Sequence, residues 1–306
     1  MMSTDHGPAC VPRGSAMTGA VWHVDSRVSE PSEGISPRCK GKPMSELKEY
    51  TLSEFLREQG TNFRTALPIV HTSESKNLLR MLTDEKVAVT ECDTFRGENL
   101  AYFFHGRPAY RRYHVRPKQW QLPFVLVLKS TCLLAMKRVF PFDSGAFFSG
   151  RLPDYLGDFD HAGYELSENS NPIDLLIDIF FGSDRDYFFG NPKPTQEVVH
   201  RKRLNIRHSE IMALCSMYNG DQLDADDRTL TIELQSDRDV SIKDQLLGVV
   251  MPRPYFEDKT LKALLKSRKV IAKTYDTHPI STESYVAQVY TEVKAIYAKL
   301  GLLDGR

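Results

Sequence analysis

Residue types suited to binding a nucleotide cluster between positions 71 and 111. His71 and Thr72 carry side chains that can hydrogen-bond a ribose or an amide. Aromatic rings further along can stack on a flat heterocycle, and guanidinium groups beside them can hold phosphates bidentately. We therefore predict a nucleotide pocket with two walls, formed by His71, Thr72, Tyr102, Phe103, Arg107, Tyr110 and Arg111. The alternative is a buried histidine beside an ordinary strand, without a ligand.

The elements expected around this cluster place its residues at strand ends. A short apolar strand, Leu67–Val70, is predicted to deliver His71, Thr72 and Ser73 to a turn. A helix then runs to about Leu82, and a second strand spans Leu100–Phe104. That strand is expected to break at the sequence HGRP, residues 105–108, because glycine and proline interrupt regular structure.

A second informative segment is Thr229–Ser236, where apolar and polar residues alternate as in a strand. The alternation puts Glu233 in the middle of the polar face, where its carboxylate faces either solvent or a cleft, and we expect it to point into the cleft that contains His71. Glu210 is the rival acid. It lies within Ser209–Tyr218, whose apolar spacing is helical, and we expect it on a helix surface.

Two further clusters allow other chemistry. Asp226 and Asp227 precede Glu233 at a spacing that could hold magnesium in a nuclease, although adjacent acids before a strand are also common in turns. Glu197–Arg207 is predicted to be a helix or strand, and the basic run at residues 200–208 within and after it either contacts nucleic acid or forms a solvated helix face. Its candidate contacts to a nucleic-acid backbone are Arg201, Lys202, Arg203 and Arg207.

Composition sets wide bounds on function. The 306 residues include 40 Lys plus Arg and 40 Asp plus Glu, so the zero net charge gives no bulk attraction to nucleic acid. The five cysteines show no metal-ligand spacing, which indicates reduced thiols in a cytoplasmic protein and no metal site. No apolar run approaches the ~20 residues of a membrane helix, so no membrane partner is expected.

The sequence divides near residue 43. Residues 1–43 are rich in Pro, Gly and Ser without apolar periodicity, which predicts a disordered N-terminal extension. Translation starting at Met44 is an alternative to Met1. Residues 44–306 alternate short helices and strands, which predicts a single α+β domain.

Several other elements are expected in that domain. Leu122–Leu128 and Leu246–Met251 read as apolar strands, and the aromatic segment 141–148 as a tight turn. Helices are predicted from Thr51 or Ser53 to Glu58 and over Ile173–Phe181. Residues 282–303 form an amphipathic C-terminal helix, expected to pack as a lid or clamp.

A strand ending in HTS, the helix ESKNLLRML, the strand LAYFF with GRP and a late strand with a central Glu together resemble the ADP-ribosyltransferase fold. Within it, the pattern is closest to the DarT-type DNA ADP-ribosyltransferase toxins. The resemblance spans about Leu67 to Pro252 and implies a split mixed sheet with flanking helices. The segment RHSEIMAL imitates the family's acid motif as well as DRTLTIEL does, and residues 158–195 have no counterpart in the family.

This resemblance implies that NAD is a substrate and that Glu233 is the catalytic acid. His71 and Thr72 would hold the nicotinamide-ribose end of NAD, and Tyr102 or Phe103 would line the nicotinamide pocket. It also implies a toxin or phage-defence effector that modifies nucleic acid and is controlled by an antitoxin or immunity protein. The alternatives are a non-catalytic binding module of the same fold, or the magnesium-dependent nuclease that uses Asp226, Asp227 and Glu233.

Overall fold

An eight-stranded mixed sheet forms the centre of the protein. The computed structural model describes residues 48–303 apart from 110–111, 133–135, 221–225 and 279–280. The sheet has the order β10-β9-β5-β1-β4-β7-β6, with the short strand β3 (Thr90–Glu91) paired to β4. Its long strands are β1 (Ile69–Glu74), β4 (Asn99–His105), β5 (Pro123–Leu128), β6 (Arg138–Phe140), β7 (Glu233–Ser236), β9 (Leu246–Pro252) and β10 (Ile271–Tyr275). Only β9 and β10 pair in parallel among these strands, so the sheet is mixed, as predicted.

Strand β5 lies inside the sheet because both of its faces are apolar. All six of its residues are buried, and it pairs with β1 on one side and β9 on the other. A continuous apolar run is the pattern of a strand that is covered on both faces. The predicted strand at 122–128 is therefore confirmed.

The pairing of β1 is unequal on its two sides. β1 pairs with β5 through six residue pairs, from Ile69 to Glu74. With β4 it pairs only through Ile69–His105 and Val70–Phe104. Beyond Val70 the ladder between β1 and β4 ends, so the sheet splits there while each strand keeps its other neighbour.

Helix α10 (Val286–Leu300) covers one face of the sheet at its β5, β9 and β10 edge. A Cβ on Gly248 of β9 would lie 2.8 Å from the Ile296 side chain of this helix, so any larger residue there would force Ile296 to shift. The predicted C-terminal amphipathic helix is thus confirmed from Val286, with a short 3₁₀ turn (Thr282–Tyr285) before it. It is part of the core, because Val293, Ile296 and Tyr297 are fully buried.

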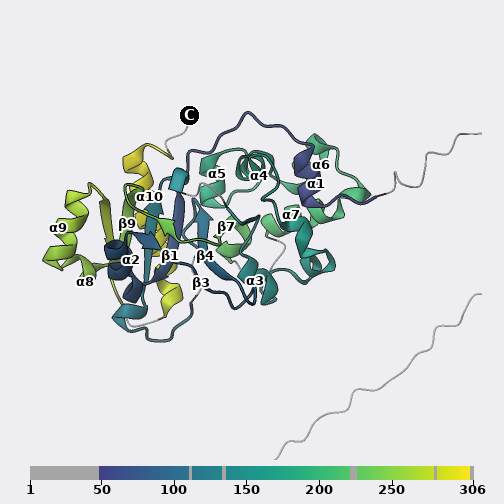
Figure 1. Ribbon diagram of the computed structural model, residues 1–306. Helices are drawn as coiled ribbons and strands as arrows, with labels where there is room; N and C mark the ends of the chain where they lie inside the picture. The colour runs from purple at the N-terminus through teal and green to yellow at the C-terminus, as the bar shows by residue number, and fades with distance from the viewer. Residues whose placement is uncertain (1–47, 110–111, 133–135, 221–225, 279–280, 304–306) are drawn as a thin grey trace, which may run out of the picture. The chain divides into compact units, whose positions relative to one another are not determined.

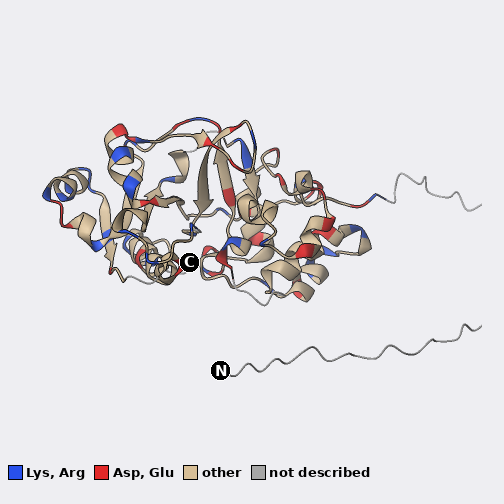
Figure 2. Ribbon diagram, turned by 90° about the horizontal axis from the view of Figure 1, so that it is seen from below, with Lys and Arg blue, Asp and Glu red and all other residues tan. Residues whose placement is uncertain are grey.

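The other helices form two groups beside the sheet (Figure 1). α8 (Arg253–Phe256) and α9 (Lys259–Ser267) lie at the β9–β10 edge, and α2 (Leu78–Asp84) follows β1. Beyond β7 and β6 lie α1 (Leu52–Arg57), α3 (Ser144–Phe148), α4 (Pro172–Phe180), α5 (Asp184–Phe189), α6 (Thr195–Lys202) and α7 (Ser209–Tyr218). A small ladder joins β2 (Lys86–Val87) to β8 (Val240–Ser241). Basic and acidic residues are interspersed along these elements, in keeping with the balanced charge (Figure 2).

Three sequence predictions about local structure are wrong. His71, Thr72 and Ser73 lie inside β1, which continues to Glu74 because its pairing with β5 continues that far. The predicted turn at 141–148 contains the helix α3, which Asp143 caps by accepting the Ala146 N–H. The predicted strand from Thr229 begins only at Glu233, since a 3₁₀ turn (Asp227–Leu230) precedes it.

Other predictions agree with the structure. The helix Ser209–Tyr218 has the predicted bounds, and the basic run begins in the last turn of α6 and ends in a 3₁₀ turn, Ile206–His208. The predicted disordered extension, residues 1–43, lies outside the described residues, as do Tyr110 and Arg111. No helix in the described part of the chain has the length and apolar character needed to span a membrane.

Candidate functional site

The strand register decides which predicted site residues share a face of the sheet. Val70 pairs with Phe104, and Phe104 pairs with Glu233, so these three side chains leave the sheet on the same face. Side chains alternate along a strand. Thr72 and Tyr102 therefore lie on the face of Glu233, whereas His71 lies on the opposite face.

His71 packs between the strands where the sheet splits. Its ring lies 5.5 Å from that of Phe103, and its Nδ1 is 2.8 Å from the Tyr102 carbonyl oxygen. Its Nε2 is buried without a hydrogen-bond partner, and burial lowers the pKa of the ring. β1 and β4 are adjacent strands, as predicted, but the register does not open the side chains of His71 and Tyr102 into one cleft. Nor does it point Glu233 toward His71.

Glu233 lies at the inner end of a polar network on its own face. Its Oε1 accepts hydrogen bonds from the Ser144 hydroxyl at 2.6 Å and from the Gln235 amide at 2.7 Å. Its Oε2 accepts the backbone N–H of Ser144 at 3.2 Å. The Gln235 carbonyl oxygen accepts from Arg138, which also forms an ion pair with Glu98 at 2.7 Å. The network therefore runs from a half-buried ion pair at the edge of the sheet to a fully buried carboxyl group.

Burial, and after it the nearby Asp143 carboxylate, raise the pKa of Glu233 to about 8. The hydrogen bonds from Ser144 and Gln235 oppose this shift because they stabilise the charged form. The prediction of a polar strand face is wrong in one respect: all four residues of β7 are buried, and Ser144 of α3 covers the Glu233 carboxyl group. A buried carboxyl group whose pKa is strongly raised is a candidate functional group.

The aromatic and hydroxyl groups predicted to bind NAD differ in their exposure. Tyr102 is half-buried, and its hydroxyl lies 2.7 Å from Cys92 Sγ. Thr72 is also half-buried and donates to the Ala109 carbonyl oxygen at 2.5 Å. Phe103 is completely buried on the opposite face, in contact with His71. Tyr102 and Thr72 are thus the predicted pocket residues that share the Glu233 face.

Arg107 is a buried structural residue in this structure. Its Nη1 donates to the carbonyl oxygens of Tyr187 and Phe188 at 2.8 and 2.9 Å, and its Nε donates to Thr231 at 3.2 Å. These carbonyls belong to the last turn of α5, where a cation is favourable. Because the guanidinium is 5% exposed and bound to the protein, it is not positioned to hold a pyrophosphate.

Glu210 is not on a helix surface, as its spacing predicted, but 5% exposed at the first turn of α7. Its Oε1 accepts the Leu52 N–H of α1 at 2.7 Å, so the carboxyl group joins two helices. Burial raises its pKa to about 7. Burial between α7 and α1 explains the shift without a ligand, and the hydrogen bond from Leu52 opposes it.

We expect Glu210 to make folding less stable as pH rises. A carboxyl group with a folded pKa near 7 and an unfolded pKa near 4.5 gives stability that is full below pH 4.5 and lost through pH 7. Urea denaturation at pH 5 and at pH 8 gives the free energy of unfolding that each protein loses between these pH values. This loss should be smaller in Glu210→Gln than in the unaltered protein, by about 1–3 kcal/mol. Glu168→Gln, whose side chain is 84% exposed, is the matched control and should keep the original loss. An identical loss in Glu210→Gln would contradict the assignment.

The predicted nucleic-acid contacts lie on α6 and the segment after it. Arg201 forms an ion pair with Glu197, and Lys202 donates to Gln59. The Arg207 guanidinium lies 4.9 Å from the Tyr50 ring and donates to the Lys48 carbonyl oxygen, while Arg203 is the left-handed C-cap of α6. Figure 1 shows α6 beside α1 and apart from β1 and β4, so the structure does not bring this basic run to the Glu233 face.

The acids proposed for magnesium have protein partners instead. Asp226 forms an ion pair with Arg228, and the Asp227 carboxylate accepts the Tyr290 hydroxyl at 2.6 Å. Among the described residues, no group of three or more His, Cys, Asp and Glu side chains could hold a metal ion. The magnesium-dependent nuclease therefore gains no support.

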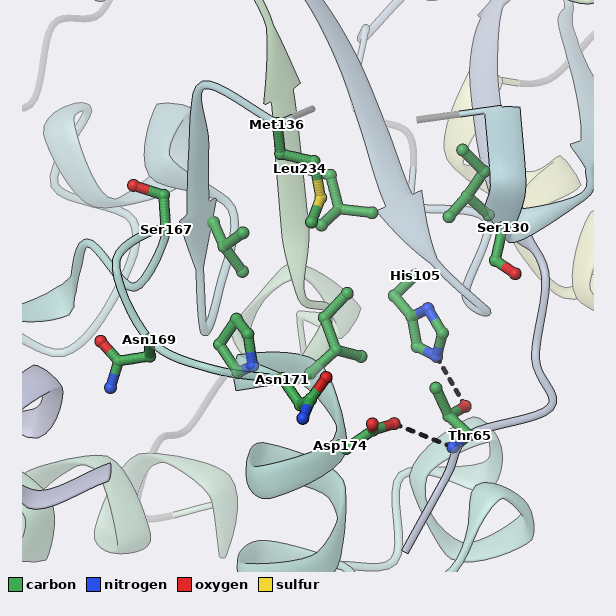
Figure 3. Close-up of a pocket in the computed structure, with 13 residues that line it drawn as sticks. Thr65, His105, Ser130, Met136, Ser167, Asn169, Asn171, Asp174 and Leu234 are labelled. Atoms are coloured by element: carbon green, nitrogen blue, oxygen red, sulfur yellow. Dashed lines mark hydrogen bonds between the residues drawn. The ribbon is translucent and has the colours of Figure 1, made fainter. Parts of the chain in front are cut away.

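His105 is a buried polar residue that the sequence analysis treated only as part of a strand break. Its Nε2 lies 2.9 Å from the Thr65 hydroxyl, which donates to Asp184 at 2.6 Å. His105 lines a cavity of about 480 Å³ on the face opposite Glu233, together with Thr65, Asn171 and Asp174 (Figure 3). Its partners come from distant segments, so no local pattern in the sequence indicates this site.

Comparison with known proteins adds no relative. No protein-family model matches the chain, and a search of curated proteins finds no significant match.

Proposed function

We propose that this protein is an NAD-dependent ADP-ribosyltransferase in which Glu233 is the catalytic acid. The observation that carries the proposal is the shared face of Glu233, Tyr102 and Thr72, next to the place where β1 and β4 diverge. A buried carboxyl group and a half-buried aromatic ring on one side of a split sheet are what a nicotinamide riboside would need. The fold resemblance adds to this, since a split mixed sheet is what it implies.

In the proposed reaction the bond between the ribose C1′ and the nicotinamide nitrogen breaks, and nicotinamide leaves with the bonding electrons. A nucleophile of the acceptor forms a new bond to C1′ and loses its proton. The sugar becomes positively charged in the transition state, so the Glu233 carboxylate, bound to the ribose 2′-OH, would stabilise it. Tyr102 would stack on the nicotinamide ring, and Thr72 would bind the ribose.

This assignment requires a local opening of the structure. Glu233 is 1% exposed, and the hydroxyl and N–H of Ser144 occupy its oxygens. The ribose 2′-OH would have to replace the Ser144 hydroxyl, so the first turn of α3 would move when NAD binds. The raised pKa of Glu233 would fall in the same event, since a positive sugar favours the ionised acid.

The acceptor and the biological role rest on the resemblance. It supports a cytoplasmic toxin or phage-defence effector that modifies nucleic acid and is held by an antitoxin or immunity protein. A non-catalytic binding module of the same fold remains the alternative, because Glu233 is covered in this structure.

Incubation of the protein with NAD labelled in its adenylate part, in total cell extract, tests the proposal. We expect label to become covalently attached to DNA, RNA or protein, and separate nuclease and protease digestion identifies which. Release of free ADP-ribose alone would show that water is the acceptor. If NAD binds but is not consumed, the protein is a binding module and the proposed activity is wrong.

A further inference from the structure

Gln235 lies beside Glu233 on the same face of β7, because residues two apart in a strand share a face. In the register of the sheet, Gln235 pairs with Tyr102 of β4 on one side and with Arg138 of β6 on the other. Directly paired residues of neighbouring strands also share a face. Gln235 therefore lies between the Tyr102 ring and the Arg138 guanidinium, next to the proposed catalytic acid.

Glu233 is held by two residues, of which Gln235 can stay in place during the proposed reaction. Its Oε1 accepts from the Ser144 hydroxyl at 2.6 Å and from Gln235 Nε2 at 2.7 Å, and its Oε2 accepts the Ser144 N–H. The proposed function requires the ribose 2′-OH to replace the Ser144 hydroxyl and the first turn of α3 to move. Because Gln235 belongs to the sheet and not to α3, its bond to Oε1 remains and fixes the orientation of the carboxylate.

Arg138 determines which end of the Gln235 amide faces Glu233. A guanidinium group only donates, so its Nη1, which lies 3.1 Å from Gln235 Oε1, must face the amide oxygen. The amide nitrogen is thereby turned toward the carboxyl group. Without Arg138 the amide can flip, and its oxygen would then repel the ionised Glu233 carboxylate.

Arg138 is itself held in one orientation by Glu98 and Phe95. Its two terminal nitrogens donate to the two Glu98 carboxylate oxygens at 2.8 and 2.7 Å, which makes a bidentate ion pair. The guanidinium carbon also lies 4.4 Å from the centre of the Phe95 ring. The pKa of Glu98 is lowered to about 2, by Arg138 first and then by Lys137, so this carboxylate is charged at neutral pH. The orientation of the buried amide is thus fixed by an ion pair at the edge of the sheet.

We propose that Gln235 is a positioning residue for Glu233 in ADP-ribose transfer, and that Arg138 acts through Gln235 by orienting its amide. This inference rests on the proposed function. The carboxylate stabilises the ribosyl transition state only while it stays aligned with the 2′-OH, and a displacement of about 1 Å can cost about 10²-fold in rate. Gln235 keeps that alignment after Ser144 has moved, and the ion pair of Arg138 with Glu98 keeps the amide from turning.

An NAD analogue that lacks the 2′-OH of the nicotinamide ribose tests this role, because Glu233 is proposed to contact that hydroxyl. The measured quantity is the ratio of kcat/KM for NAD to kcat/KM for the analogue. The intrinsic reactivity of the two substrates cancels when this ratio is compared between variants. Gln235→Met has a side chain of similar length without a donor, and should lower the ratio about tenfold, mostly through kcat for NAD. The Kd for NAD, measured by calorimetry, should stay within about twofold.

Arg138 is tested with the same two substrates. Arg138→Met should lower the ratio about fivefold, whereas Arg138→Lys keeps a donor for the Gln235 oxygen and should recover most of it. Lys137→Met is the matched control. Lys137 binds the same Glu98 carboxylate at 2.8 Å, and it donates to Gln235 with its backbone N–H, which the substitution keeps. This control should leave the ratio unchanged.

The outcomes separate this inference from the proposed function. If the unaltered protein transfers no label from NAD, the proposed function is wrong, and this inference is wrong with it. If the unaltered protein transfers label while folded Gln235→Met and Arg138→Met keep its ratio, this inference alone is wrong. An equal fall of the ratio in Lys137→Met would overturn the role of Arg138. Circular dichroism checks each fold, and Arg138→Met, at a side chain that is 18% exposed, tests the inference if Gln235→Met does not fold.

Discussion

Replacing Glu233 with glutamine should abolish NAD-dependent labelling while the protein stays folded. Glutamine has the shape of glutamate but cannot offset the positive charge of the ribosyl transition state, and loss of such a group costs about 10²–10³-fold in rate. Its oxygen can still accept the Ser144 N–H, and the Ser144 hydroxyl can rotate to accept from its amino group, although the Gln235 amide loses its acceptor on Oε1. The measurement is label transfer per minute at saturating NAD, with circular dichroism as the folding check.

Stability separates a catalytic role of Glu233 from a structural one. The pKa of Glu233 is raised to about 8, so its ionisation in the unfolded state favours unfolding between pH 4.5 and 8. Glutamine removes this effect, and the free energy of unfolding at pH 7 should stay the same or rise. Lower activity together with unchanged or higher stability indicates an acid that is kept for function.

Glu210→Gln is the matched control for this experiment. Glu210 is also a buried glutamate with a raised pKa, but it joins α7 to α1. Its variant should keep label transfer within about twofold, because removing a group remote from the reacting atoms leaves transition-state binding unchanged. Full activity in Glu233→Gln would refute the assignment of the acid, and loss of activity only in Glu210→Gln would transfer the role to Glu210.

Replacing Arg107 with alanine should lower the free energy of unfolding by about 3 kcal/mol. The guanidinium satisfies two carbonyl oxygens at the end of α5 and lies 5.5 Å from the Tyr290 ring of α10. Removing it leaves buried acceptors without a donor and opens a gap between α5, α10 and the end of β4. Urea denaturation at constant pH measures the loss.

Arg107→Lys distinguishes this role from phosphate binding. Lysine keeps the positive charge but cannot reproduce the planar set of donors, so we expect it to be destabilising as well. Arg112→Ala is the control, because its side chain is 69% exposed and should have little effect on stability. If Arg107→Ala keeps its stability and loses NAD affinity, Arg107 binds the pyrophosphate, as the sequence predicted.

The sequence by itself determined the elements whose apolar pattern is strong. The continuous run at Pro123–Leu128 gave a strand buried on both faces, and the helical spacing at Ser209–Tyr218 gave a helix with the observed bounds. These features are local, because the period of the apolar residues depends only on the geometry of the element.

The tertiary structure alone decided which of these residues meet. Pairing of β1 with β5 extended the strand through His71, and a difference of one residue in register placed His71 and Glu233 on opposite faces. Burial of Glu210 depends on α1, 158 residues earlier in the chain, and the partners of Arg107 lie on α5. The burial and the hydrogen-bond partners of a residue are set by contacts between distant segments. The sequence pattern of a single helix or strand therefore does not predict them.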